Sequence, residues 1–328
     1  MRKLHFVILI CSFIPIILIA GQRKVLLIGV DGIRSDVIKY CQTPNINFIS
    51  KNGFGSFQSM HQDITMSGPS WSSILCGVYH QKHGVEDNTF KNSRYDQFPM
   101  LCSPAKNINP QLKFGAYIEW SSLYNVCVPM KWDTLIKGNM GHTRETNTKA
   151  SSWLGNSDMD FYFVYFGEAD HMGHHFGFSR FNPFYKRALG RIDESIGALI
   201  NAIRSRDSYL DEDWLILLTT DHGGKGLGHG GYSPEEREIM WWAYSEGIVA
   251  RNFDATEHGN LNMECFPYCD VEDRSAPVQA DIAITALHHL LYKDCPTFEQ
   301  DCKIGFDGKS WLAEMGLTQS RSQQVTLR

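Results

Sequence analysis

The chain has 328 residues, of which 43% are hydrophobic and 20% are charged, and its formal net charge is −5. Such a chain folds into a globular protein with a sizeable core, built as one large domain or two small ones, and is not a disordered or fibrous sequence. The mild acidic balance, without any basic run, argues against a nucleic-acid-binding surface.

The first 21 residues, MRKLHFVILICSFIPIILIAG, have the pattern of a secretory signal peptide. A basic start is followed by an apolar stretch from Phe6 to Ala20, which is short for a membrane span. Cleavage is expected near Ala20 or Gly21, but Leu18 and Ile19 are not the small residues that signal peptidases prefer. We therefore expect a secreted or lumenal protein with a mature chain 22–328. An uncleaved N-terminal membrane anchor is the alternative.

Apolar runs and helical periodicity alternate along the rest of the chain. Runs typical of buried strands lie at 24–30, 113–120, 160–166, 214–220 and 239–245. Helical patterns lie at 44–51, 71–79, 183–204 and 281–292, and 251–280 is expected to be irregular. This alternation predicts an α/β fold: a single compact domain with a doubly wound, mostly parallel central sheet flanked by helices.

Acidic and imidazole side chains follow three of the predicted strands. Asp31 comes directly after the first, the motif GEADHMGHHFG follows the third, and TTDHGG ends the fourth. Because ligand sites in open α/β sheets lie beyond the carboxyl ends of the strands, we expect these groups to meet at one edge. Crowded carboxylates repel one another unless a cation compensates their charge.

The number of these residues is sufficient for two metal ions with three protein ligands each. Asp170 and His174 lie four residues apart and can share one face of a helical turn. Carboxylate and imidazole ligands suit zinc. The two expected ligand sets are Asp170, His174 and His229 for one ion, and Asp31, Asp221 and His222 for the other.

The stretch SGPSW combines a candidate nucleophile and a candidate helix cap. Ser67 lies just before the expected helix, where a metal and free amide groups could activate its hydroxyl, and Ser70 is expected to be the N-cap. Trp71, one turn from Ser67, either stacks on a nucleobase or lines the core.

The order of these motifs resembles the alkaline phosphatase superfamily: Asp31, Ser67, Asp170-x-x-Gly-His174, Asp221-His222-Gly and Gly-His229-Gly. The stretches GVYHQKHGVEDN and EADHMGHHFG are most similar to its nucleotide pyrophosphatase/phosphodiesterase branch, over residues 24 to 292. The resemblance implies two zinc ions, a covalent phosphoserine on Ser67, which would also contact the metal, and hydrolysis of phosphoric esters such as phosphodiesters or nucleotide pyrophosphates.

The sequence also departs from this branch. Ser70 stands where the family has an asparagine that holds phosphoryl oxygens, and Asn88 matches a family position near the substrate, so both are candidate substrate-binding residues. A phosphomonoesterase, a sulfatase-like hydrolase and a non-catalytic metal-binding scaffold remain alternatives. The sulfatase motif, however, has arginine where this chain has Trp71. The expected partner is a small phosphate ester or nucleotide-like molecule.

Eight cysteines follow the predicted signal peptide, as expected for an oxidising compartment. The pairs expected first are Cys295 with Cys302 and Cys102 with Cys127. The motif CFPYC at 265–269 lacks a matching partner pair, which argues against a zinc knuckle.

Overall fold

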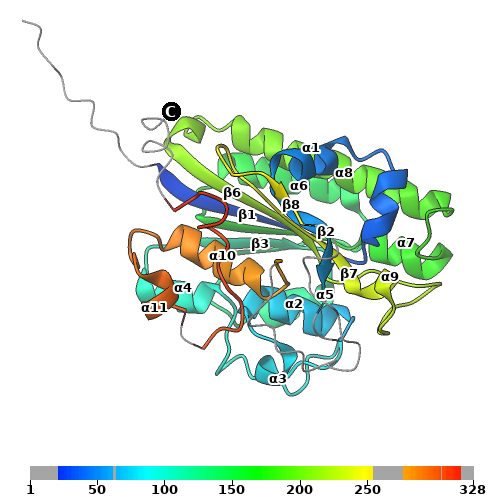
Figure 1. Ribbon diagram of the computed structural model, residues 1–328, viewed down its shortest axis with the longest axis horizontal. Helices are drawn as coiled ribbons and strands as arrows, with labels where there is room; N and C mark the ends of the chain where they lie inside the picture. The colour runs from blue at the N-terminus through cyan, green and yellow to red at the C-terminus, as the bar shows by residue number, and fades with distance from the viewer. Residues whose placement is uncertain (1–20, 62–63, 254–275, 304, 319–328) are drawn as a thin grey trace, which may run out of the picture.

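In a computed structural model, the described residues are 21–61, 64–253, 276–303 and 305–318, and they form one α/β body (Figure 1). Residues 1–20 of the predicted signal peptide and the cysteines at 265 and 269 lie outside these residues. Among the described helices, none is both long and apolar enough to span a membrane.

The centre of the described part of the chain is one eight-stranded mixed sheet with the order β4-β3-β5-β1-β6-β7-β2-β8. The strand β1 runs parallel to its neighbours β5 and β6, and β3 runs parallel to its neighbours β4 and β5. The strand β7 runs antiparallel to both β6 and β2. The strands are β1 (Gln22–Val30), β2 (Phe54–Met60), β3 (Phe114–Ile118), β4 (Thr134–Lys137), β5 (Phe161–Phe166), β6 (Glu212–Thr220), β7 (Glu238–Tyr244) and β8 (Arg251–Asn252).

All five predicted strands are present, and the predicted fold class is confirmed. The sequence did not predict β2, β4 or β8. The strand β2 reads FGSFQSM, in which glycine and serine replace the β-branched residues that mark buried strands. The other two are short edge strands, of which β4 is only partly buried. Residues 254–275 of the predicted irregular segment lie outside the described residues.

Two layers of helices cover the two faces of the sheet (Figure 1). One layer contains α1 (Pro44–Asn52), α6 (Thr143–Asn156), α7 (Glu168–Phe176), α8 (Pro183–Arg204) and the 3-10 helix η1 (Ser35–Tyr40). The other contains α2 (Ser67–Cys76), α3 (His80–His83), α4 (Cys102–Ile108), α5 (Ser121–Cys127), α10 (Asp281–Leu290) and α11 (Phe298–Asp301). Two short helices, α9 (Pro234–Arg237) and η2 (Tyr209–Asp211), lie beside the ends of β6 and β7.

Local sequence explains where the main helices begin and end. Proline occupies the first position of α8, and the preceding Asn182 accepts a 2.9 Å hydrogen bond from the amide of Phe184, as an N-cap should. The start of α1 is capped from a distance, because the Asp193 carboxylate of α8 accepts hydrogen bonds from the amides of Asn45 and Ile46. The helix α2 ends at Gly77, whose φ of 68° is left-handed.

The predicted N-cap role of Ser70 is wrong. The helix α2 begins at Ser67, its N-cap is Met66, and Ser70 lies within the first turn. The Ser70 hydroxyl donates to the Met66 carbonyl at 2.6 Å, so it bonds back within the helix instead of capping its first amides. The nucleophile candidate Ser67 is consequently the first residue of the helix itself.

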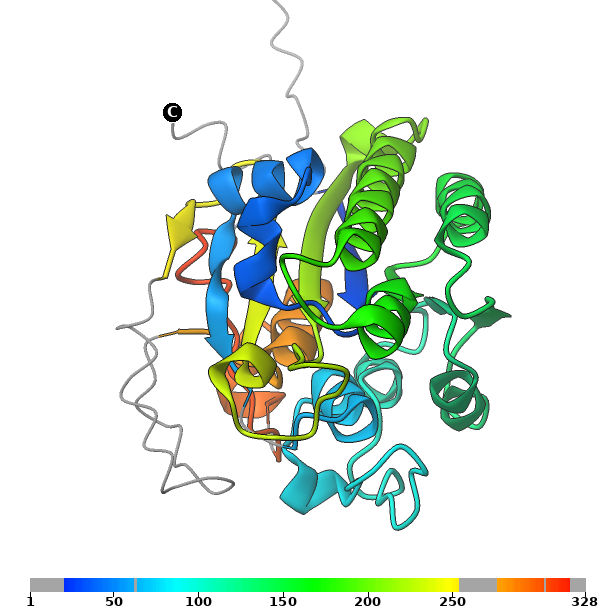
Figure 2. The ribbon, with the colours of Figure 1, turned by 90° about the vertical axis from the view of Figure 1, so that its right-hand side faces the viewer.

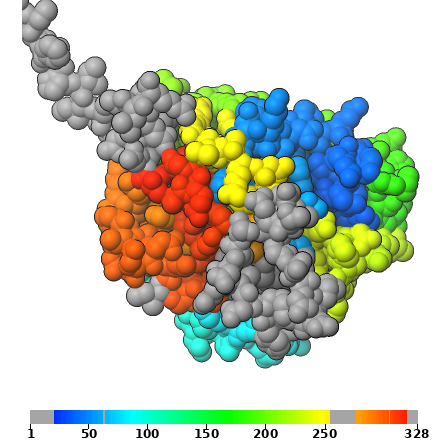
Figure 3. Space-filling view, in the orientation of Figure 1, coloured from blue at the N-terminus to red at the C-terminus, as the bar shows by residue number. Residues whose placement is uncertain are grey.

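One of the two predicted disulfides is confirmed and the other is wrong. Cys295 and Cys302 are bonded, and both belong to the segment after residue 275, whose described part Figure 3 shows in orange and red. Cys102 and Cys127 are both buried and free, and the Cys127 thiol contacts the sulfur of Met100 at 3.7 Å instead. Cys41 and Cys76 are free as well.

Candidate metal centre and nucleophile

Three neighbouring strands end side by side and bring the polar motifs together. Val30 of β1 lies opposite Phe166 of β5 and opposite Thr220 of β6, and all three strands are parallel. The chain after each strand therefore emerges at the same edge, which Figure 2 views with α7 and α9 around it. The amide of Asp170 donates to the carbonyl of Asp31 at 3.1 Å, which ties α7 to the end of β1.

Asp31, Asp221 and His222 form the first cluster, with one potential ligand atom from each lying within 4.8 Å of the others. The Nε2 atom of His222 lies 3.3 Å from Asp221 Oδ2 and 3.6 Å from Asp31 Oδ1. Among the described residues, neither of these buried oxygens has a hydrogen-bond partner. Buried carboxylate oxygens without partners are costly, and a cation would compensate that cost.

Gly32 allows the two clusters to lie close together. Its φ is 72°, and a Cβ atom built on it would lie 2.7 Å from the backbone of Asp170. Its amide donates to Asp221 Oδ1 at 3.0 Å, which leaves the other oxygen of Asp221 facing His222. A side chain at residue 32 would therefore push α7 away from the end of β1.

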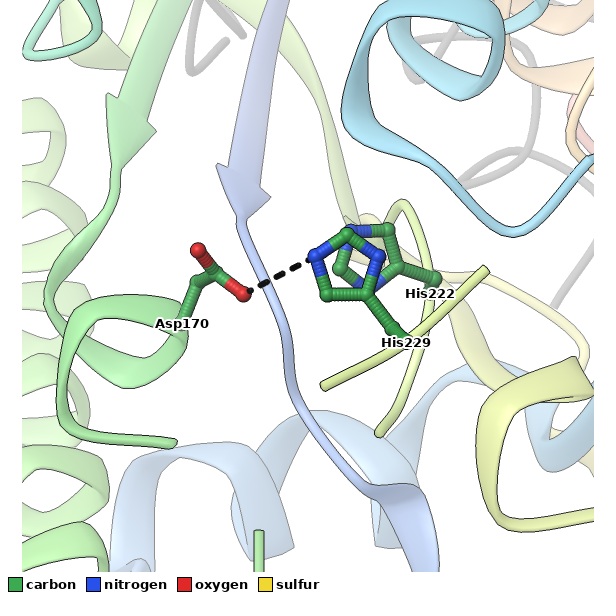
Figure 4. A group of neighbouring side chains, drawn as sticks. All are labelled: Asp170, His222 and His229. Atoms are coloured by element: carbon green, nitrogen blue, oxygen red, sulfur yellow. Dashed lines mark ion pairs between the residues drawn. The ribbon is translucent and has the colours of Figure 1, made fainter. Parts of the chain in front are cut away.

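Asp170, His174 and His229 form the second cluster. Asp170 Oδ1 lies 3.4 Å from His174 Nε2 and 3.7 Å from His229 Nε2, and the two Nε2 atoms are 3.1 Å apart. Figure 4 shows Asp170 directed toward His229 from the opposite side of the chain after β1. This Oδ1, like Oδ1 of Asp31 and Oδ2 of Asp221, is a buried carboxylate oxygen without a hydrogen-bond partner among the described residues. The predicted helical turn that carries Asp170 and His174 is α7.

The three histidines are oriented alike by the backbone. The Nδ1 atoms of His174, His222 and His229 lie 2.9, 2.7 and 2.8 Å from the carbonyls of Leu227, Gly223 and Thr65. A carbonyl oxygen only accepts, so each Nδ1 carries the proton and each Nε2 is directed at the carboxylates. Backbone-anchored imidazoles of this kind are typical of metal ligands.

His222 lies between the two clusters. Its ring stacks on that of His229 with centroids 3.7 Å apart and an interplanar angle of 21° (Figure 4). Potential ligand atoms of Asp170, His222 and His229 also lie within 4.8 Å of one another. The geometry therefore brings together all six predicted protein ligands other than Ser67, and the division into two sets of three stays a prediction.

Burial dominates the electrostatics of the site. Burial, and secondly the charge of Asp31, raise the pKa values of Asp170 and Asp221 well above the ordinary range of an aspartate. Burial lowers the pKa values of His222 and His229 to about 3, so both rings are neutral at pH 7. Neutral imidazoles are the form that binds metal ions.

Ser67 lies at the edge of the first cluster. Its side chain is buried, and its Oγ atom is 3.3 Å from His222 Nε2. A histidine with a pKa of about 3 is a poor general base at neutral pH, so a serine–histidine dyad does not explain this contact. The alternative means of activating a serine is a metal ion held beside it.

The two predicted substrate contacts near Ser67 have different environments. Asn88 is exposed, and its Oδ1 accepts a 2.7 Å hydrogen bond from the amide of Gly68, which leaves its Nδ2 group as a donor. Ser70 is buried, and its hydroxyl lies 2.7 Å from His61 Nε2. The Ser70 hydroxyl is thus engaged within the fold, and its role in substrate binding stays a prediction.

Sequence reasoning missed two residues that support the ligands. Tyr165 in β5 donates from its hydroxyl to Asp31 Oδ2, and Thr65 accepts from His229 Nδ1. The alternation in β5 places Tyr165 on the same face as Phe161 and Phe163, which indicated a core residue and not a ligand contact. Trp71 was expected either to stack on a nucleobase or to line the core, and the core position is confirmed because the ring is fully buried.

Comparison with known proteins agrees with these motifs. The sequence profile described as "Type I phosphodiesterase / nucleotide pyrophosphatase" matches residues 25–109 and 112–230, which is more than half of the chain. The human ectonucleotide pyrophosphatase/phosphodiesterase family member 7 is 24% identical over 227 residues, covering 62% of this chain and 48% of that protein. The human bis(5'-adenosyl)-triphosphatase ENPP4 is 27% identical over 218 residues, covering 61% of this chain and 47% of that protein.

This chain spans about half the length of these two relatives. Among solved structures, murine ectonucleotide pyrophosphatase/phosphodiesterase 5 has a TM-score of 0.60 at 15% identity, covering 82% of this chain and 95% of that chain. A phosphonate monoester hydrolase of Agrobacterium radiobacter has a TM-score of 0.63 at 13% identity, covering 90% of this chain and 77% of the other. At these identities, the structural likeness shows the fold alone.

Proposed function

Because the chain belongs to the type I phosphodiesterase/nucleotide pyrophosphatase family, we propose that it is a metal-dependent hydrolase of phosphoric esters. Its preferred bonds are phosphodiester or nucleotide pyrophosphate bonds. One observation carries the proposal: three buried, unpartnered carboxylate oxygens face imidazole nitrogens beside the hydroxyl of Ser67. A divalent cation bound here would compensate the charge of these carboxylates beside the hydroxyl of Ser67.

Two zinc ions suit these ligands in number and kind, since all are carboxylate oxygens and imidazole nitrogens. Asp31, Asp221 and His222 would hold the ion nearer Ser67, and Asp170, His174 and His229 would hold the other. When bound, the ions would supply positive charge that stabilises the serine alkoxide and the anionic transition state.

The remaining steps concern residues of the chain. The Ser67 oxygen attacks phosphorus as the P–O bond to the leaving group breaks, so that a phosphoserine forms and the leaving group departs as an alcohol or phosphate with the proton that Ser67 lost. Water then attacks phosphorus, the P–O bond to Ser67 breaks, the phosphate product departs, and a proton of the water restores the hydroxyl. Asn88 Nδ2 is placed to donate to a phosphoryl oxygen, because its Oδ1 is held by the Gly68 amide.

Two relatives support a nucleotide-like substrate. The human ENPP4 is named for its action on bis(5'-adenosyl) triphosphate, and murine family member 5 has been solved in complex with AMP. We propose that the substrate of the present chain is a small phosphate ester that carries a nucleoside or a similar group. Asn88 is exposed, so a substrate of this kind could reach it from solvent.

Turnover assays test the proposal directly. The mature protein, with and without added zinc, is assayed on bis-p-nitrophenyl phosphate, p-nitrophenyl phosphate and p-nitrophenyl sulfate, beside Ser67→Ala. A matched control is Ser152→Ala, which makes the same change on the exposed surface of α6. We expect diester turnover that disappears on chelation and in Ser67→Ala but not in Ser152→Ala. Turnover of the monoester alone would favour a phosphomonoesterase, and turnover of the sulfate alone would favour a sulfatase-like hydrolase. Zinc-loaded protein that is inactive on all three substrates and on nucleotides would favour a non-catalytic metal-binding scaffold.

We also propose that residues 1–21 are a signal peptide and that 22–328 form one secreted or lumenal catalytic domain. The described residues support one domain, because Arg23 at the start of β1 donates to the carbonyl of Leu317 at 3.2 Å. N-terminal sequencing of protein secreted by expressing cells should begin near Gln22. A product that retains Met1 and stays with the membrane would support the anchor instead.

A further inference from the structure

The Asp31 carboxylate is held by two donors on one of its oxygens. The indole Nε1 of Trp71 donates to Oδ2 at 3.1 Å, and the hydroxyl of Tyr165 donates to the same oxygen. The other oxygen, Oδ1, has no partner among the described residues and faces His222 Nε2 at 3.6 Å. The two oxygens of one side chain thus have opposite environments.

Trp71 reaches Asp31 because β1 contains a glycine at residue 29. A Cβ atom built on Gly29 would lie 2.4 Å from Cη2 of the indole, so any larger residue would displace the ring. The fully buried indole packs against Tyr165 and Phe163, with ring centroids 5.1 and 5.7 Å away. Its position is therefore fixed by the core and not by the Asp31 contact alone.

Trp71 and Ser67 belong to the same helix. They lie four residues apart in α2, so their side chains project from the same face of that helix. Ser67 contacts His222 while Trp71 contacts Asp31, and both of those residues belong to the first cluster. The indole contact therefore links the nucleophile helix to the predicted metal ligands.

We infer that Trp71 and Tyr165 are positioning residues for Asp31: by occupying Oδ2, they make Asp31 a ligand through Oδ1 alone. This inference rests on the proposed metal centre. A carboxylate that bound through both oxygens would fill one more coordination position and leave less room for Ser67 and the substrate. The partners that orient a metal ligand typically change metal affinity or activity 10- to 100-fold.

The test uses Co²⁺ as a probe, because its visible spectrum reports coordination number. The variants are Trp71→Phe and Tyr165→Phe, which remove one donor each, and their combination. Trp242→Phe is the matched control, since this buried indole has no hydrogen-bond partner among the described residues and packs on Phe57. Affinity is measured by competition with a chromophoric chelator, and zinc is titrated in the same way.

We expect each donor variant to weaken Co²⁺ binding at one of the two sites about 10-fold. The visible bands of that site should lose intensity as its coordination number rises above four, and Trp242→Phe should match the parent. Donor variants with the parent's affinity and spectrum would overturn the inference. If Trp71→Phe fails to fold, Tyr165→Phe carries the test alone, because it keeps the whole ring.

The same experiment separates this inference from the proposed function. A parent protein that binds neither Co²⁺ nor zinc would overturn both. A parent that binds two ions, with altered spectra in the donor variants but no phosphoric ester hydrolysis, would refute the proposed function and support the positioning role.

Discussion

The Nε2 atoms of His174 and His229 face each other at 3.1 Å, while the Nδ1 atom of each ring is held by a backbone carbonyl. With each Nδ1 protonated, both Nε2 atoms carry a lone pair, and two lone pairs cannot form a hydrogen bond. A proton on one of the Nε2 atoms or a shared cation therefore has to lie between the rings. Asp170 Oδ1, only 3.4 Å from His174 Nε2, brings a potential anionic ligand to the same point. The arrangement is one that a divalent cation stabilises.

Metal removal should therefore destabilise the protein. Ligands that bind the folded state alone stabilise it, by about 2.7 kcal/mol when their free concentration is 100 times the dissociation constant. We expect chelation to lower the melting temperature by several degrees and zinc to restore it, as measured by differential scanning calorimetry. Unchanged melting in the presence of a chelator would contradict the metal centre.

Replacing His174 should remove one metal ion and not both. We expect His174→Ala to bind about one zinc ion where the parent binds two, as measured by elemental analysis after dialysis, because the first cluster keeps its ligands. His142→Ala is the matched control, since this exposed histidine before α6 lies outside both clusters. Two ions retained by His174→Ala would show that the second cluster is assigned wrongly.

Zinc affinity should rise with pH. The raised pKa values of Asp170 and Asp221 mean that these carboxyls keep protons above the usual aspartate range in the metal-free protein, and zinc has to displace them. The pKa values of about 3 for His222 and His229 mean that these rings have no proton to lose at neutral pH.

Calorimetric titrations in buffers of different ionisation enthalpy should accordingly show proton release that decreases as the pH rises. Each displaced proton changes the affinity by up to about tenfold per pH unit. Binding without proton release between pH 4 and 8 would contradict this account.

Asn88 should matter for turnover and not for metal binding. We expect Asn88→Ala to lower kcat about 10²-fold, the usual cost of losing one donor to a developing anion, with an unchanged zinc content. Gly68→Ala should have a similar effect, because its Cβ would lie 2.3 Å from the carbonyl of Asp87 and displace Asn88. Steady-state kinetics and elemental analysis check both variants, and parental kcat in Asn88→Ala would rule out its role.

The cysteines should react according to the structure. Peptide mapping without reduction should show Cys295 linked to Cys302, and Cys102 and Cys127 should become alkylated only after unfolding, because both are buried. Burial raises the pKa of Cys102 to about 11, which also makes its thiol unreactive in the folded state. A linked Cys102–Cys127 peptide from folded protein would instead support the pairing expected from the sequence.

The sequence alone was sufficient for the fold class and for expecting the six candidate metal ligands at one edge of the sheet. Strands such as β1 and β6 are continuous apolar runs, which is how strands buried on both faces of a parallel sheet appear in sequence. Because such strands end at a common edge, the residues that follow them, Asp31 and Asp221 among them, could be placed together without coordinates. The strand β2 escaped prediction because glycine, serine and glutamine interrupt its apolar residues.

Only the tertiary structure decided how these residues contact one another. Tyr165 lies 134 positions from Asp31 in the chain, and no local pattern indicates that its hydroxyl meets that carboxylate. The position of the Trp71 indole likewise depends on the absence of a side chain at Gly29, in a different element. Cys102 and Cys127 stay unpaired for a similar reason, since the direction of each thiol is set by its helix and its packing. The periodicity of apolar residues indicates which face of a helix or strand is buried, whereas side-chain contacts depend on packing between distant segments of the chain.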